Sequence, residues 1–117
     1  MTDPDCLFCK ILARKIPSTV VYENNEVLGI KDVNPQAPVH ALMISKKHIA
    51  SVNEIGPSAF PGAADGLVHA ANEAARRFKI DESGYRLVIN CKKDGGQTVD
   101  HLHLHLLGGR RMTWPPG

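Results

Sequence analysis

The sequence has no long apolar run and little net charge, and each absence excludes a class of partner. Its opening, Met1 to Asp5, carries acids where a secretory signal would carry bases, and no apolar segment is long enough to cross a membrane. The net charge of +2 comes from basic residues scattered as short pairs, which falls short of a nucleic-acid-binding stripe. We therefore expect a cytoplasmic protein that binds neither a membrane nor a nucleic acid.

Cysteine is also scarce, and its number is odd. Three cysteines do not make a disulfide framework, and they suit a reducing compartment. Two of them, Cys6 and Cys9, form a Cys-x-x-Cys pair whose spacing is shared by metal ligands and by packed structural thiols. A redox role for this pair is disfavoured because no βαβ pattern follows it.

Internal repeats and low-complexity segments are absent as well. A chain of 117 residues with 43% hydrophobic residues is long enough to bury one core. We therefore expect a single domain over residues 1–117.

The apolar periodicity predicts an α+β fold. Asp3 followed by Pro4 is typical of a helix start, so we expect a short N-terminal helix that Pro17 ends. Apolar residues at spacings of four and three predict a long helix from Phe60 to Phe78. Glycines and polar residues predict a loop over residues 92–98. An antiparallel sheet of five strands, covered by the long helix, accounts for the β-rich runs Val20–Tyr22, Val27–Ile30, Val39–Ser45, Tyr85–Cys91 and His101–Leu107.

The last of these runs alternates histidine and leucine: His101, His103 and His105 are separated by single leucines. Successive side chains of a strand point to opposite faces, so the three imidazoles share one face and the leucines face the core. Burying three imidazoles is costly unless every ring nitrogen finds a partner, which favours a chemical role. The residues alone leave two such roles open, a metal site and chemistry by imidazole itself. Gly95 and Gly96, just before the strand, favour phosphate chemistry because glycines let backbone N–H groups turn toward an anion.

The stretch His101 to Leu107 matches the histidine triad motif, in which three histidines alternate with apolar residues. On this motif the chain resembles the histidine triad (HIT) family, and specifically its Hint branch. The resemblance covers nearly the whole chain, and it includes Asp32 to His40, Lys46 to His48, Asn90, Gly95 to Thr98 and Gly108 to Gly117.

The resemblance implies a HIT-like fold and a nucleotide hydrolase or transferase that cleaves purine nucleoside 5′-phosphoramidates at the α-phosphorus. By the family pattern His103 is the nucleophile and forms a nucleotidyl-histidine that water resolves. His105 and Thr98, with the amides of Gly96 and Gln97, hold the non-bridging oxygens, and His40 contacts the same centre. No cofactor is expected for this step.

The resemblance also implies a nucleoside slot, in which Asp32 accepts from the ribose hydroxyls. Plain core remains the alternative reading for Phe8, Ile30 and Leu42. The full set of residues expected to bind substrate is Phe8, Ile16, Ile30, Asp32, Val33, Leu42, Asn90, Gly96, Gln97, Thr98, His103, His105 and Trp114.

Members of the family that carry the Cys-x-x-Cys pair bind a structural zinc ion, for which the matching ligands here are Cys6, Cys9, His48 and His101. The set of two cysteines and two histidines is a complete tetrahedral site with no open position. The alternative is a pair of half-buried helix cysteines without a metal.

The resemblance further implies a homodimer that pairs through residues 60–78 and 85–91, with Trp114 of one subunit beside the other subunit's nucleotide. The β-rich run from Tyr85 would otherwise be an unpaired edge strand. Three rival functions stay open at this point: a dinucleoside polyphosphate hydrolase, a nucleotide-binding regulatory or scaffold protein, and a metal-dependent enzyme with the three triad histidines as ligands.

Overall fold

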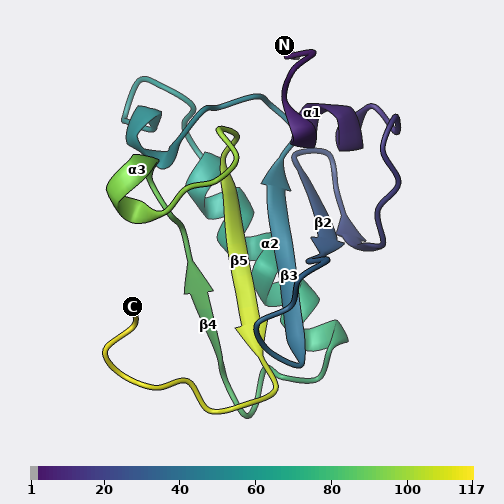
Figure 1. Ribbon diagram of the computed structural model, residues 1–117, viewed down its shortest axis with the longest axis vertical. Helices are drawn as coiled ribbons and strands as arrows, with labels where there is room; N and C mark the ends of the chain where they lie inside the picture. The colour runs from purple at the N-terminus through teal and green to yellow at the C-terminus, as the bar shows by residue number, and fades with distance from the viewer. Residues whose placement is uncertain (1–2) are drawn as a thin grey trace.

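A computed structural model describes residues 3–117 and is built on one antiparallel sheet (Figure 1). The five strands lie in the order β1-β2-β3-β5-β4, which confirms the predicted five-stranded α+β fold. Their bounds are β1 Val20–Glu23, β2 Val27–Lys31, β3 Val39–Ser45, β4 Tyr85–Val88 and β5 His103–Gly108.

Helices cover both faces of this sheet. The long helix α2, Ala63–Arg77, crosses one face, and the short helix α1, Leu7–Leu12, lies near the start of β2 and the end of β3 (Figure 1). A 3₁₀ turn, Val52–Glu54, follows β3, and a single-turn helix α3, Lys92–Gly95, precedes β5. No helix within residues 3–117 is long and apolar enough to cross a membrane.

The alternation in β5 divides the two faces as the sequence predicts. Leu102, Leu104 and Leu106 are at most 1% exposed and pack in the cluster that contains the alanine face of α2. On the other face, Phe8 of α1 packs with Leu42 and Ile44 of β3, which are the register partners of His105 and His103. The histidines therefore lie under α1 and the leucines under α2.

Both predicted helix starts are wrong. Asp3 does not cap a helix, because its carboxylate and carbonyl accept from the N–H groups of Asp5 and Cys6 and form a turn. Helix α1 begins at Leu7, where the thiol of Cys6 accepts from the N–H of Cys9 as the cap. Helix α2 begins at Ala63 and not at Phe60, since Phe60 and Gly62 adopt left-handed φ angles of 52° and 81° that no helix accommodates.

The last two strands are shorter than predicted. β4 ends at Val88 and not at Cys91, and β5 begins at His103 and not at His101. The predicted loop between them contains α3, which the sequence pattern does not reveal because a single turn has no apolar periodicity. As a result His101 lies outside the strand ladder.

Candidate active site and metal centre

The central histidine of the triad, His103, is held in one tautomer. The residue is 6% exposed, and its Nδ1 lies 2.7 Å from the backbone carbonyl oxygen of His101. A carbonyl can only accept, so Nδ1 carries the proton and Nε2 keeps its lone pair. This is the arrangement that a nucleophilic imidazole requires.

A second pair of histidines is ordered by another backbone group. The N–H of Gln36 donates to Nδ1 of His40 at 3.0 Å, which places the proton of neutral His40 on Nε2. That Nε2 lies 2.9 Å from Nδ1 of His105 and 3.3 Å from the carboxylate of Asp32. When His40 donates to His105, Nδ1 of His105 is the acceptor, so its own proton lies on Nε2.

Burial favours the uncharged form of His103 and of His105 at neutral pH. Burial lowers the pKa of His105 to about 4, and the neighbouring His103 and His40 add to this effect while Asp32 opposes it. Burial also lowers the pKa of His103, against its hydrogen bond to the His101 carbonyl. The site thus presents an unprotonated Nε2 on His103 beside an N–H donor on His105, with ring centroids 5.2 Å apart.

On distance alone, Asp32, His40 and His105 could also hold a metal ion, because their ligand atoms lie within 4.8 Å of one another. The N–H of Gln36 donates to Nδ1 of His40, which leaves the proton of the neutral ring on Nε2. This opposes metal binding, because a metal would need the lone pair of Nε2. We therefore read the three residues as a hydrogen-bonded chain.

The loop before β5 is held by hydrogen bonds of its own backbone and of the Gln97 side chain. The amides of Gly96 and Gln97, expected to contact phosphate oxygens, donate to the carbonyls of Lys93 and Lys92, each at 3.0 Å. The Gln97 side chain accepts from the N–H of Lys92 at 2.9 Å and donates to the carbonyls of Ala50 and Val99 at 2.8 and 2.9 Å. Gln97 thereby joins three segments, and the neighbouring Thr98 is exposed.

The residues expected in the nucleoside slot fall into two groups. Phe8, Ile30 and Leu42 are buried in one cluster beside the histidines, with the half-buried Ile16 packed against it. These residues can therefore be core residues and also lie next to the site.

The remaining expected contacts are more open to solvent. Val33 and Trp114 are 99% and 81% exposed, and Asn90 is half-buried. The Asp32 carboxylate serves as a turn former as well as a neighbour of His40, because it accepts from the N–H of Asn34 at 2.8 Å.

The predicted metal ligands converge on one point. Nδ1 of His101 lies 3.3 Å from Sγ of Cys6 and 3.6 Å from Sγ of Cys9, and Nδ1 of His48 lies 3.2 Å from Sγ of Cys9. The two Nδ1 atoms are 3.1 Å apart. All four ligand atoms lie within 4.8 Å of one another.

One nitrogen of this cluster, Nδ1 of His101, is free to accept or to bind a metal. Nε2 of His101 donates to the carbonyl oxygen of Ser45 at 2.6 Å, so its Nδ1 is unprotonated. Because Nδ1 of His101 faces the cysteines while Nδ1 of His103 is bound to a carbonyl, the triad histidines do not converge on a single ion. This speaks against the metal-dependent enzyme.

The sequence did not predict two backbone groups that fix histidine tautomers, the N–H of Gln36 and the carbonyl of Ser45. Both act through the backbone, and no side-chain pattern signals them.

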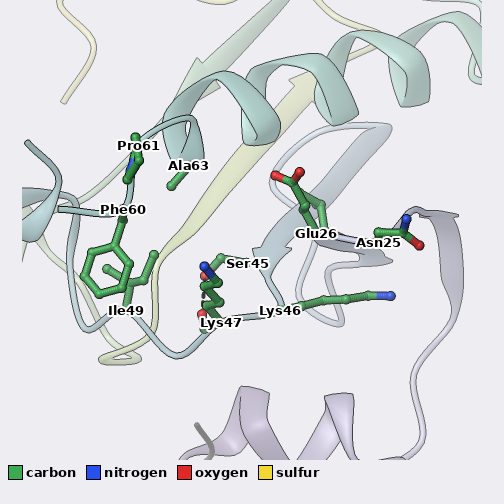
Figure 2. Close-up of a pocket in the computed structure, with 10 residues that line it drawn as sticks. Asn25, Glu26, Ser45, Lys46, Lys47, Ile49, Phe60, Pro61 and Ala63 are labelled. Carbon is green, nitrogen blue, oxygen red and sulfur yellow. Dashed lines mark hydrogen bonds between the residues drawn. The ribbon is translucent and has the colours of Figure 1, made fainter. Parts of the chain in front are cut away.

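The sequence also did not predict a cavity of about 260 Å³ (Figure 2). It lies between the start of α2, the start of β2 and the end of β3, with Phe60 and Ile49 on one side and Glu26 on another, and no triad histidine lines it.

Comparison with known proteins supports the interpretation of the histidines. A family model of the HIT domain matches residues 13–112. The chain belongs to the HIT family. It is 48% identical over 115 residues to an uncharacterized HIT-like protein of Synechocystis, with 97% of each chain covered. A solved HIT family hydrolase from Legionella pneumophila is 50% identical, with a TM-score of 0.89 over 97% of this chain and 100% of that one.

Other HIT relatives carry names that mention ligands. A 14 kDa zinc-binding protein of Brassica juncea is 42% identical over 126 residues, covering 97% of this chain and 100% of its own. A Zn-bound histidine triad protein from Mycobacterium smegmatis is 32% identical, with a TM-score of 0.78 over 91% of this chain and 76% of its own. A histidine triad nucleotide-binding protein from Candida albicans is 30% identical, with a TM-score of 0.78 over 87% and 73% of the two chains.

Proposed function

We propose that this HIT protein is a nucleotide hydrolase of the Hint branch that cleaves purine nucleoside 5′-phosphoramidates through a nucleotidyl intermediate on His103. The observation that supports this most is the protonation pattern, an unprotonated Nε2 on His103 beside an N–H donor on His105. A nucleophile and a donor side by side are what displacement at phosphorus requires.

In the first step Nε2 of His103 attacks the α-phosphorus, the phosphorus–nitrogen bond breaks, and the amine leaves with a proton taken from water. The Nδ1 proton stays on His103 and is donated in a hydrogen bond to the carbonyl oxygen of His101, which stabilises the positive charge that the modified ring acquires. His105 Nε2–H and the Thr98 hydroxyl donate to the non-bridging oxygens. In the second step water attacks phosphorus, the bond to Nε2 breaks, and a nucleoside monophosphate is released.

The test is a substrate panel with purified protein. Adenosine phosphoramidate should be turned over faster than diadenosine polyphosphates, and rapid quenching should show the protein heavier by one nucleotidyl group. Preference for the dinucleotides would favour the rival hydrolase. Binding of AMP without any turnover would favour a regulatory or scaffold protein.

We also propose that the Cys6, Cys9, His48 and His101 cluster holds one structural zinc ion. A tetrahedral site with Zn–S near 2.3 Å and Zn–N near 2.0–2.1 Å has ligand–ligand edges of about 3.3–3.8 Å. Four of the six edges measure 3.1–3.6 Å, close to that geometry, and the unprotonated Nδ1 of His101 faces the two cysteines. The zinc-binding names of two relatives agree with this assignment.

Metal analysis of protein expressed with zinc and then dialysed tests the proposal. One equivalent per chain is expected in the wild type, and well below one in Cys9→Ser. Cys91→Ser is the matched control, because Cys91 lies outside the cluster. If the wild type holds less than a tenth of an equivalent of zinc, the proposal is wrong and the cysteines are packing residues only.

A further inference from the structure

Phe8 lies against the nucleophile rather than in an open slot. The residue is 4% exposed, and its ring meets the His103 ring edge-on, with centroids 4.9 Å apart and planes at 85°. The same ring meets His101 at 5.9 Å and 75°. Edge-to-face contact of this kind restricts the rotation of both rings.

The position of Phe8 depends on how α1 is attached. A helix of six residues is far too short to be stable on its own, so tertiary contacts must hold it. Two of those contacts are made by Cys6 and Cys9, whose sulfurs approach Nδ1 of His101 and of His48. The cysteines flank Phe8 along the chain, so whatever fixes them also fixes its ring.

His101 connects the cluster to the nucleophile by a second route. Its Nδ1 belongs to the metal cluster, its Nε2 is bound to Ser45, and its carbonyl holds the Nδ1 proton of His103. The tautomer of His103 is therefore set by the backbone of a cluster residue, and its ring plane is set by a side chain from the helix that the cluster anchors.

We infer that Phe8 is a positioning residue for His103, and that the Cys6, Cys9, His48 and His101 cluster keeps Phe8 and the His101 carbonyl in place. This inference rests on the proposed function and on the proposed zinc site. It extends the role of the metal centre from stability to the orientation of the nucleophile, and it gives Phe8 a role other than contact with the nucleoside.

The test uses imidazole nitrogen NMR, which reports the tautomer and mobility of His103 whether or not the protein is active. In the zinc-loaded wild type, His103 should show one sharp Nδ1–H tautomer. In Phe8→Leu, and in wild type stripped of metal by a chelator, the same resonances should broaden or shift toward a tautomer mixture. Leu7→Ala is the matched control, because Leu7 lies on the same helix and is 44% exposed.

Kinetics supply the second readout. Phe8→Leu should lower kcat by about 10- to 100-fold, the scale expected for a misplaced reacting group, while KM for the nucleotide changes less than about twofold. Phe8→Tyr keeps the ring and should recover most of kcat. Thermal melting confirms that each variant is folded, and Phe8→Met replaces Phe8→Leu if the latter does not fold.

The inference is overturned if Phe8→Leu and the metal-free protein both keep the sharp His103 tautomer. It is also overturned if Phe8→Leu raises KM and leaves kcat unchanged, which would make Phe8 a slot wall only. A wild type that turns over no phosphoramidate would defeat the proposed function, while the NMR comparison would still decide the role of Phe8.

Discussion

Two backbone groups decide which nitrogen carries the proton in His103 and in His40. The carbonyl of His101 places it on Nδ1 of His103, and the N–H of Gln36 places it on Nε2 of His40. Neither group is visible as a side chain in the sequence, yet together they separate a nucleophile from a donor. The chemistry proposed for the site therefore depends on single hydrogen bonds of the main chain.

Replacing His103 tests this assignment most directly. His103→Asn should lower turnover by about 10³-fold or more, because the attacking nitrogen is lost, while nucleoside monophosphate still binds. His105→Ala removes one donor and should cost on the order of 10²-fold. The exposed His69 on α2 offers the control His69→Asn. Steady-state rates and calorimetric binding provide the measurement, and wild-type turnover by His103→Asn would refute the mechanism.

The lowered pKa of His105 predicts a loss of stability in acid. In the unfolded chain His105 takes up a proton near pH 6.5, whereas in the folded protein it does so only near pH 4. The unfolded state thus binds more protons between these values, so the free energy of unfolding should fall as the pH drops from about 6.5 to 4 and this contribution should level off below.

Urea unfolding across this range tests the prediction, with histidine NMR to follow His105 itself. His105→Asn should give a shallower dependence on pH than the wild type. A His105 resonance that titrates near pH 6.5 in the folded protein would contradict the expected burial effect.

At the scale of helices and strands, the bounds of an element can be predicted where local sequence signals alone set them. β3 begins and ends at the predicted residues, Val39 and Ser45, because its β-forming run is continuous and its preceding prolines set the entry. The start of α1 was mispredicted, since a local signal at Asp3 and Pro4 competes with a tertiary one at Cys6. The thiol of Cys6 caps the helix because the cluster with His101 holds it there.

The α3 loop yields a prediction about Gln97. Gln97→Ala deletes three hydrogen bonds, one each to Lys92, Ala50 and Val99, so it should lower the free energy of unfolding by about 1–3 kcal/mol and speed amide exchange over residues 92–98. Gln36→Ala is the matched control. Its side chain makes one exposed bond, to the carbonyl of Asn34, so the change should stay within about 0.5 kcal/mol. Equal losses in the two variants would remove the special role of Gln97.

At the scale of the whole molecule, β4 is one of the two edge strands of the sheet, the other being β1. It ends the strand order with β5 as its neighbour, and each of its residues is half-buried. The C-terminal tail runs beside it, because Arg86 of β4 donates to the carbonyl of Thr113 at 2.9 Å. We propose that a second copy of the chain pairs at this edge and at α2, which would bring Trp114, 81% exposed here, close to the partner's site.

Sedimentation at micromolar concentration should show a dimer. Deleting residues 113–117 should change the preference among leaving groups more than it changes the affinity for AMP, since the tail would form a wall beyond the nucleotide. Arg86→Lys, which weakens the hold on the tail without shortening the chain, should shift this preference in the same direction. A monomer, or a truncated protein with unchanged preference, would contradict the proposal.

The sequence by itself determined the sheet, the two-faced histidine strand and the family, because alternation and motif spacing are local properties that survive without knowledge of the fold. It also singled out the four cluster ligands, through a Cys-x-x-Cys pair and two histidines of the matched segments. Only the tertiary structure decided the tautomers, the hydrogen bonds that the Gly96 and Gln97 amides make within their loop, and the contact of Phe8 with His103. Those features depend on backbone groups and ring edges brought together from distant parts of the chain, and a one-dimensional pattern carries no record of such distances.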